Sequence, residues 1–270
     1  MSGVQLTLRQ SPALRVDLRG VVPAACDGLT PAQIERLSVT HGNQTLALAE
    51  FFTVALTAAD DELRIEGDLS RFDRIGWQLA RGRIVVTGAV GDYVGAGMTA
   101  GSVHVHGHAG VLAACEMAGG SLVVDGNVGD FAASTLPGSM DGMRGGMFIV
   151  KGNAGARFGD RMRRGTALVF GDAGDFIASR MVAGTIGLGG AAGAHVGYGM
   201  RRGSVVFAGA APRIAATFVP AIAEASVFWQ LLARDLARHG GPFAALASRR
   251  AVRHLGDVSA GGKGELIVAL

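Results

Sequence analysis

His104, His106 and His108 are the residues whose types and spacing most resemble a set of metal ligands in this sequence. Alternate residues of a β-strand share one face of a sheet, and imidazole nitrogens are common zinc ligands. His108, however, falls beyond the expected end of the strand, and no nearby carboxylate completes a ligand set by spacing. We therefore favour surface histidines over a metal site, and we predict no metal ligand in this chain.

Nucleophilic and cofactor-binding motifs are weak as well. Cys26 and Cys115 form no redox or metal-binding pair, and we expect Cys115 to be packed rather than reactive. Glycine patterns that imitate a dinucleotide-binding turn begin at Gly95 and Gly187, but neither lies between a strand and a helix. Aspartates recur after a turn glycine, which indicates a structural role, at Asp92, Asp130 and Asp175. The sequence predicts no catalytic residue.

Arginines form a charged pattern that supports a binding hypothesis. Arg163 and Arg164 directly follow Met162, Arg201 and Arg202 directly follow Met200, and Arg144 takes the same place after an earlier methionine. Guanidinium groups bind carboxylates through charge-assisted hydrogen bonds. If these segments stack, their arginines form one basic stripe. The stripe is either a solvated face or a contact for an anion or a protein partner.

The elements that carry these residues repeat along the chain. The pattern G-x5-G-x2-G-x6-M-x2 occupies residues 61–209, mostly in units of 19 residues. The unit that starts at Gly120 has 26 residues, and its extra seven lie around Leu136 to Gly142. A degenerate unit, Asp61 to Gly82, has Trp77 in the methionine position.

Each unit predicts one strand. The second and fourth residues after the opening glycine are apolar, whereas the third and fifth are mixed, so one face of the strand is always buried. A single unit cannot bury its apolar face alone, but stacked units bury a continuous core. We predict an all-β fold, a parallel β-helix of about seven coils. The recurring methionines should line its interior as a column: Met98, Met117, Met143, Met162, Met181 and Met200.

The flanks differ from the repeat, so we predict three regions: an N-terminal α+β cap (1–60), the repeat domain (61–209) and a C-terminal helical and extended docking segment (210–270). Thr30 should cap a short helix that begins at Pro31. A second helix, Ala225 to His239, should bury Phe228, Leu231, Leu232 and Leu236. A final segment, Glu265 to Val268, is expected as an edge strand.

Composition narrows the class of protein. Charged residues make up 17% and hydrophobic residues 49% of the chain, which excludes a disordered protein. The net charge of +3 is far from that of a nucleic-acid-binding protein. The N-terminus lacks the features of a signal peptide, and Pro220 and Glu224 interrupt the longest apolar run. We expect a cytoplasmic protein with no nucleic-acid or membrane partner.

The repeat resembles the domain shared by the C-terminal end of glutamate synthase and the C subunit of formylmethanofuran dehydrogenase. Residues 37–43 (LSVTHGN) and 48–54 (LAEFFTV) are similar to a pattern of that C subunit. The tail, with TFVP at 217–220 and GGKGE at 261–265, resembles the C subunit of the formyltransferase/hydrolase complex of aerobic methylotrophs.

This resemblance implies a non-catalytic structural subunit that assembles with subunits A, B and D. Such a complex moves a formyl group from formyl-tetrahydromethanopterin to a methanofuran-type carrier and on to formate. The resemblance implies that this chain holds no cofactor. It also implies that the metal ions, tetrahydromethanopterin and the carrier are bound by the partner subunits. The carrier bears glutamyl residues, so its anionic tail is a candidate ligand for Arg163, Arg164, Arg201 and Arg202. The alternative is the C subunit of a molybdenum or tungsten formylmethanofuran dehydrogenase, an oxidoreductase.

Overall fold

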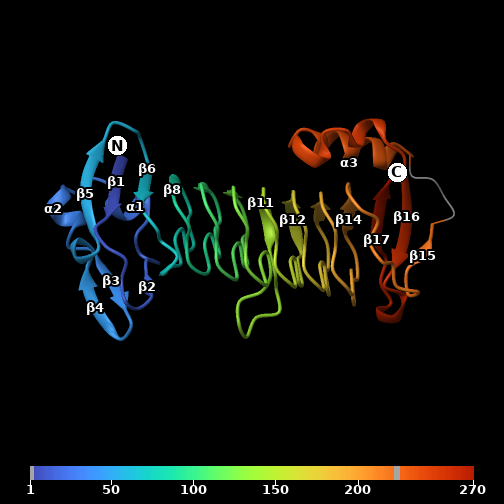
Figure 1. The fold of residues 1–270 in the computed structure, drawn as a ribbon, viewed down its shortest axis with the longest axis horizontal. Helices are drawn as coiled ribbons and strands as arrows, with labels where there is room; N and C mark the ends of the chain where they lie inside the picture. The colour runs from blue at the N-terminus through green and yellow to red at the C-terminus, as the bar shows by residue number, and fades with distance from the viewer. Residues whose placement is uncertain (1–2, 222–225) are drawn as a thin grey trace.

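A computed structural model describes residues 3–221 and 226–270 of the chain. Strands make up most of the regular structure in these ranges, so the fold is all-β (Figure 1). The repeat region contributes β6 (Glu62–Glu66), β8 (Arg83–Thr87), β9 (Ser102–Val105), β10 (Ser121–Val124), β11 (Arg144–Val150), β12 (Arg164–Val169), β13 (Thr185–Leu188) and β14 (Ser204–Phe207).

Within the described residues, thirteen strands form one sheet in the order β15-β16-β17-β14-β13-β12-β11-β10-β9-β8-β6-β1-β5. From β6 to β14 the strands are parallel and pair in register, so that Val103 lies beside Leu122 and Leu122 beside Phe148. Neighbouring strands therefore come from successive repeats, and equivalent residues of those repeats lie side by side. The strand positions that we predicted to face the core, such as Ile84, Val86 and Leu122, are buried.

A second column of parallel contacts runs beside this sheet. Isolated bridges join Leu69, Val90, Ala109, Val128, Ala154, Ala173 and Ala192, each with its equivalent in the next repeat. The turn glycines allow this close stacking: a β-carbon on Gly107 would lie 2.4 Å from the carbonyl oxygen of Gly88. The sequence pattern thus reflects backbone approach as well as burial.

The recurring methionines are confirmed as interior residues. All six predicted side chains are fully buried. Each also occupies an equivalent place, because the Met162 carbonyl accepts a hydrogen bond from Val182 N–H as the Met181 carbonyl does from Arg201 N–H. The placement of Trp77 in this column was wrong. Leu79, 19 residues before Met98, is buried there, and its carbonyl accepts from Thr99 N–H.

The N-terminal region adds two strands to one end of the large sheet and forms a small sheet beside it. Strand β1 pairs with β6 in parallel and with β5 antiparallel. The small sheet has the order β4-β3-β2-β7 within the described residues. Thr30 precedes the predicted helix, and its N–H donates to Gln33 Oε1. The remaining elements here are β1 (Gly3–Leu8), β2 (Val16–Asp17), α1 (Pro23–Cys26), α2 (Pro31–Ile34), β3 (Ser38–His41), β4 (Gln44–Ala47), the 3-10 turn η1 (Leu48–Glu50), β5 (Phe52–Thr57) and β7 (Phe72–Asp73).

The C-terminal region covers the other end. It contains β15 (Val219–Pro220), α3 (Ser226–Ala237), η2 (Gly241–Phe243), η3 (Leu246–Ser248), β16 (Ala251–Gly256), η4 (Val258–Ala260) and β17 (Gly264–Ala269). The expectation of an edge strand at Glu265 to Val268 was wrong: β17 lies between β14 and β16 and continues the register of the repeats. No helix in the described ranges has the length and apolar character that a membrane span requires.

Helix α3 lies along the outer face of the last repeats (Figure 1). Its predicted start, Ala225, lies outside the described residues. The predicted buried face was only partly correct: Leu236 is buried, but Phe228 and Leu231 are exposed. Trp229 and Ala233 are buried instead, in a cluster that includes Leu168, Val206 and Ile267 of the sheet. Because α3 covers this outer face, the third and fifth residues after the opening glycine are apolar in these last repeats.

The seven-residue insertion projects from the stack, as predicted. Figure 1 shows it as a green loop that leaves the repeats on the side opposite α3. Met140 in this loop is 63% exposed, whereas Met143, where the regular repeat resumes, is buried. Contact between this loop and a partner stays a prediction.

Candidate functional site: an arginine-lined cavity

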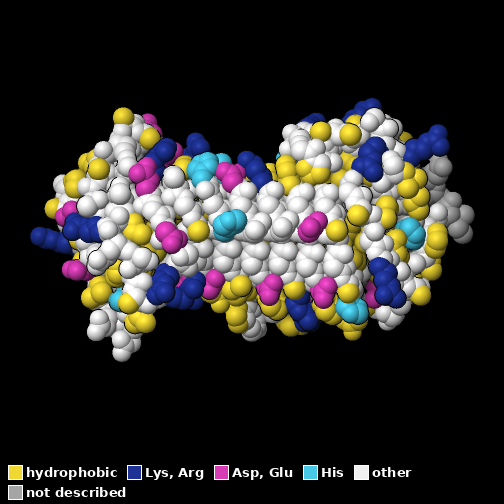
Figure 2. Space-filling view, in the orientation of Figure 1, with side chains coloured by type: hydrophobic (Ala, Val, Ile, Leu, Met, Phe, Trp, Pro, Cys, Tyr) yellow, Lys and Arg dark blue, Asp and Glu magenta, His cyan; other side chains and the backbone are white. Residues whose placement is uncertain are grey.

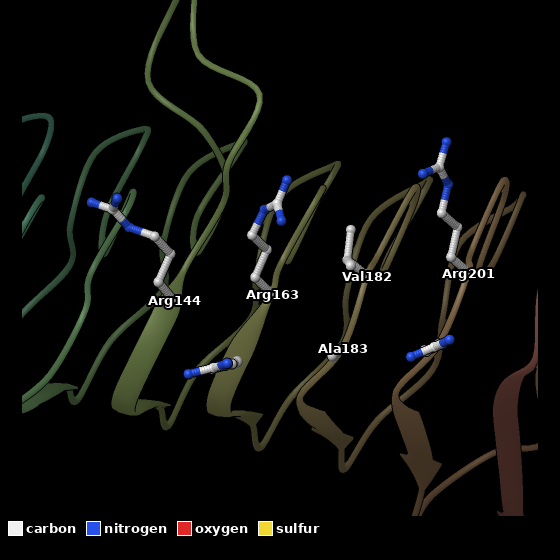
Figure 3. Close-up of a pocket in the computed structure, with 7 residues that line it drawn as sticks. Arg144, Arg163, Val182, Ala183 and Arg201 are labelled. Carbon is white, nitrogen blue, oxygen red and sulfur yellow. The ribbon is translucent and has the colours of Figure 1, made fainter.

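A cavity of about 580 Å³ lies along one edge of the repeats (Figure 3). It brings together all five arginines of the predicted stripe. The full lining is Arg144, Arg163, Arg164, Val182, Ala183, Arg201 and Arg202. Its walls are cationic, and its middle is lined by small apolar side chains.

The methionine column fixes the position of this cavity. The N–H of Arg163 donates to the Met143 carbonyl at 2.8 Å, and the N–H of Arg201 donates to the Met181 carbonyl at 2.8 Å. Because each methionine is anchored in the core, the residue after it leaves the stack at the same edge in every repeat. Val182 takes this place in the repeat between the two arginine pairs and leaves room that a longer side chain would fill.

The arginines are only partly neutralised. Arg163 Nε lies 2.6 Å from Asp141 Oδ1 of the inserted loop, and Arg144 Nη2 lies 3.8 Å from Glu116 Oε2. Among the residues that the structure describes, Arg164, Arg201 and Arg202 form no ion pair with a carboxylate. The cavity therefore has an excess of positive charge.

A second cavity of about 500 Å³ shares Arg163, Val182 and Arg201 with the first. Two further arginines, Arg161 and Arg180, line this cavity near the buried carboxylate of Asp160. Arg180 Nε and Nη2 donate to its two oxygens at 3.0 and 2.8 Å, and Arg161 Nε lies 3.9 Å away. The Asp160 carboxylate therefore pairs mainly with Arg180, whereas Arg164, Arg201 and Arg202 of the first cavity have no carboxylate partner among the described residues.

The arrangement is suited to binding an extended anion. Guanidinium groups in successive repeats are separated by multiples of the spacing between strands, about 4.8 Å. A chain that carries several carboxylates can contact several such groups at once. The structure places the arginines of the predicted stripe around one cavity, whereas their role in binding a ligand stays a prediction.

The histidines require a correction. We expected no carboxylate near them, but Asp125, one repeat after His106, lies 3.0 Å from His104 Nε2 and 2.7 Å from His106 Nδ1. Lys151 Nζ, one repeat further, lies 2.8 Å from the other carboxylate oxygen. Burial raises the pKa of Asp125, but its contacts with the Lys151 ammonium group and with both histidines outweigh it and hold that pKa well below its usual range. His108 Nδ1 instead accepts a hydrogen bond from Asn127 N–H.

The other candidates are structural. Both cysteines are buried, and burial raises the pKa of Cys26 to about 11 and raises that of Cys115 further. The recurring aspartates act as predicted: Asp92, Asp130 and Asp175 each accept a backbone N–H from the next repeat. Sequence reasoning missed the contact that Asp141 makes at the cavity, although its place in the insertion could have indicated it.

Comparisons with known proteins agree with this architecture. No model of a known protein family matches the chain. A chain in the crystal structure of the formyltransferase/hydrolase complex (FhcABCD) from Methylorubrum extorquens in complex with methylofuran matches with a TM-score of 0.91 and 40% identity. That match covers 98% of this chain and 99% of the other.

Two curated relatives match over shorter segments. The C subunit of the formyltransferase/hydrolase complex Fhc of M. extorquens is 42% identical over 86 residues, which is 32% of each protein. The C subunit of the tungsten-containing formylmethanofuran dehydrogenase 2 of Methanothermobacter wolfeii is 33% identical over 101 residues, 36% of this chain and 37% of the relative. These matches span about a third of the length of the curated relatives.

Fold and cavity together define a repeat protein whose strands stack in register and whose edge is cationic. The whole-length match shows which known proteins share this fold. The chain belongs to the family of C subunits of formyltransferase/hydrolase and formylmethanofuran dehydrogenase complexes, which confirms the resemblance identified from the repeat.

Proposed function

We propose that this chain is a non-catalytic structural subunit of a formyltransferase/hydrolase complex. The complex would transfer a formyl group from formyl-tetrahydromethanopterin to a methanofuran-type carrier and release it as formate. Subunits A, B and D would be its partners and would hold the metal ions and the pterin, in the cytoplasm. The observation that carries this proposal is the whole-length match, at 40% identity, to a chain of the M. extorquens complex.

We also infer that residues 61–209 form a parallel β-helix between an N-terminal cap (1–60) and a C-terminal docking segment (210–270). In-register parallel pairing from β6 to β14, the second column of bridges and the buried methionines support this architecture. Every repeat of such a rod presents the same residue position at one edge, so the groups of an extended ligand can contact one repeat after another.

Within the complex, the arginine-lined cavity would hold the glutamyl tail of the carrier. Arg163 and Arg201 follow methionines two repeats apart, so their backbones are separated by about 10 Å at ordinary strand spacing. Successive carboxylates could pass from one guanidinium group to the next while the tail stays mobile, because each exposed contact is weak. A mobile tail suits a carrier that must reach two separate active sites.

Asp141 supports a carboxylate ligand at this site. Its side chain, from the inserted loop, already contacts Arg163 Nε at 2.6 Å. A glutamyl carboxylate that reaches Arg163 has to displace Asp141 or share the guanidinium group with it. Asp141→Asn should therefore strengthen binding of the tail.

Replacement of Arg163, Arg164, Arg201 and Arg202 by Gln tests the site in the assembled complex. At about 0.5 kcal/mol per exposed charged contact, four losses weaken binding by about 2 kcal/mol, or roughly 30-fold. We expect the apparent KM for the polyglutamylated carrier to rise accordingly, with a larger rise at low salt.

The matched control removes four exposed arginines elsewhere by the same substitution: Arg9, Arg36, Arg213 and Arg250. It should leave KM unchanged. An intact complex in which the cavity variant keeps the wild-type KM and salt dependence would eliminate the tail hypothesis.

A second candidate is a subunit of a molybdenum or tungsten formylmethanofuran dehydrogenase. The match to the C subunit of the tungsten enzyme favours it, although the similarity covers 36% of this chain. The neighbouring gene for the B subunit discriminates between the two functions. A metal-binding cysteine in its product would favour the dehydrogenase.

A further inference from the structure

We propose that His104, His106 and Asp125 form a binding site for one zinc-like divalent cation on the outer face of the repeat sheet. The site is separate from the arginine-lined cavity, and no residue lines both. It joins two histidines of one repeat to a carboxylate of the next.

The register of the sheet creates this cluster. His104 lies on β9 opposite Val123 of β10, so that the residues two positions further, His106 and Asp125, are also neighbours. Asp125 N–H donates to the Val105 carbonyl at 2.9 Å, which fixes its backbone beside the histidines. The two imidazole rings are 4.0 Å apart between centroids. Figure 2 shows histidine next to acidic and basic side chains at the upper edge of the stack, in the gap before α3.

The donor atoms converge as a coordination site requires. One nitrogen of each histidine and one Asp125 oxygen all lie within 4.8 Å of one another. Oδ2 of Asp125 is the shared partner, at 3.0 Å from His104 and 2.7 Å from His106. Two imidazole nitrogens and a carboxylate oxygen are ligands that zinc accepts, with water in the remaining position. The side chains are 28%, 43% and 29% exposed, so a hydrated cation can reach them.

Lys151 determines how tightly this site binds. Its ammonium group lies 2.8 Å from Asp125 Oδ1, whereas both histidines contact Oδ2. It holds the carboxylate in place, but its positive charge repels a cation at Oδ2. Removal of this charge should therefore increase the affinity for a divalent cation. A simple ion-pair network would instead lose order without Lys151 and gain no metal affinity.

Isothermal titration calorimetry of the purified, chelator-treated full-length chain with Zn²⁺ tests the proposal. We expect one Zn²⁺ per chain with a Kd of about 10 µM or below. His104→Gln or His106→Gln should weaken binding at least about 10-fold. His239→Gln, which removes a histidine just beyond α3, should leave the Kd unchanged, and Lys151→Gln should lower it by roughly 3-fold or more.

Circular dichroism of each variant checks that it folds. The Lys151→Gln variant keeps all three ligands, so it tests the site even where a histidine variant fails to fold. Absence of stoichiometric binding in both the wild-type chain and Lys151→Gln would overturn the proposal. Equal affinity of the wild type and a folded His104→Gln variant would overturn it as well.

Discussion

Met162→Ala tests whether the repeats stack around a methionine column. The Met162 side chain is fully buried, and a β-carbon built on Gly184 would lie 3.1 Å from its Cε, so the space around it is filled. Backbone hydrogen bonds from Val182 and Ala183 to the Met162 carbonyl, at 2.8 and 3.2 Å, hold the next repeat at a fixed distance. The walls therefore cannot collapse into the cavity that the substitution creates.

Truncation of a fully buried methionine costs about 2–5 kcal/mol, and a rigid wall favours the upper half of that range. For a chain of this size, this corresponds to a fall in Tm of roughly 5–15 °C. Urea and thermal unfolding followed by circular dichroism measure both quantities. Met140→Ala, in the exposed inserted loop, is the matched control and should change the free energy of unfolding by less than about 0.5 kcal/mol. Equal effects of the two substitutions would refute the interior column.

Three further predictions follow from the same structure. Deletion of Leu136 to Gly142 restores the regular period, so the isolated chain should keep its Tm within a few degrees while it assembles less well; normal assembly in size-exclusion chromatography would count against a partner contact. Replacement of His104, His106 or Cys115 by Ala should leave the activity per assembled complex near wild type, and a loss of about 100-fold would reveal a missed catalytic role. Burial raises the pKa of Asp257, but hydrogen bonds from Ser259, Gly199 and Thr217 hold it below its usual value. Its stabilising effect should be complete above about pH 5 and disappear as the pH falls through the lowered pKa, so the urea midpoints of Asp257→Asn and wild type should converge on acidification.

The period of the sequence was sufficient to predict the strands, their parallel register and the burial of the methionines. Equivalent residues of successive repeats meet in space, so a 19-residue period specifies contacts that a single unit does not. The same rule would have found Asp125, 19 residues after His106, had it been applied across repeats. It would also have identified Leu79 rather than Trp77, because a degenerate unit is aligned by distance from Met98 and not by residue type.

The C-terminal helix shows where sequence reasoning fails. Leu231 and Phe228 are more hydrophobic than Ala233, so a prediction based on hydrophobicity alone buries Leu231 and Phe228. The structure buries Trp229 and Ala233 because they pack against apolar side chains on the outer face of the sheet, and Trp229 Nε1 donates to the Arg249 carbonyl at 2.7 Å. That partner is 20 residues away and cannot be found from the helix. The contact between Asp141 and Arg163 likewise depends on the path of a loop.

Purification of the tagged chain from its native source tests the central proposal most directly. We expect subunits A, B and D to co-purify with this chain, and the complex to release formate from formyl-tetrahydromethanopterin in the presence of the methanofuran-type carrier. Recovery of the chain alone would contradict the proposal, as would recovery with a B subunit that binds molybdenum or tungsten.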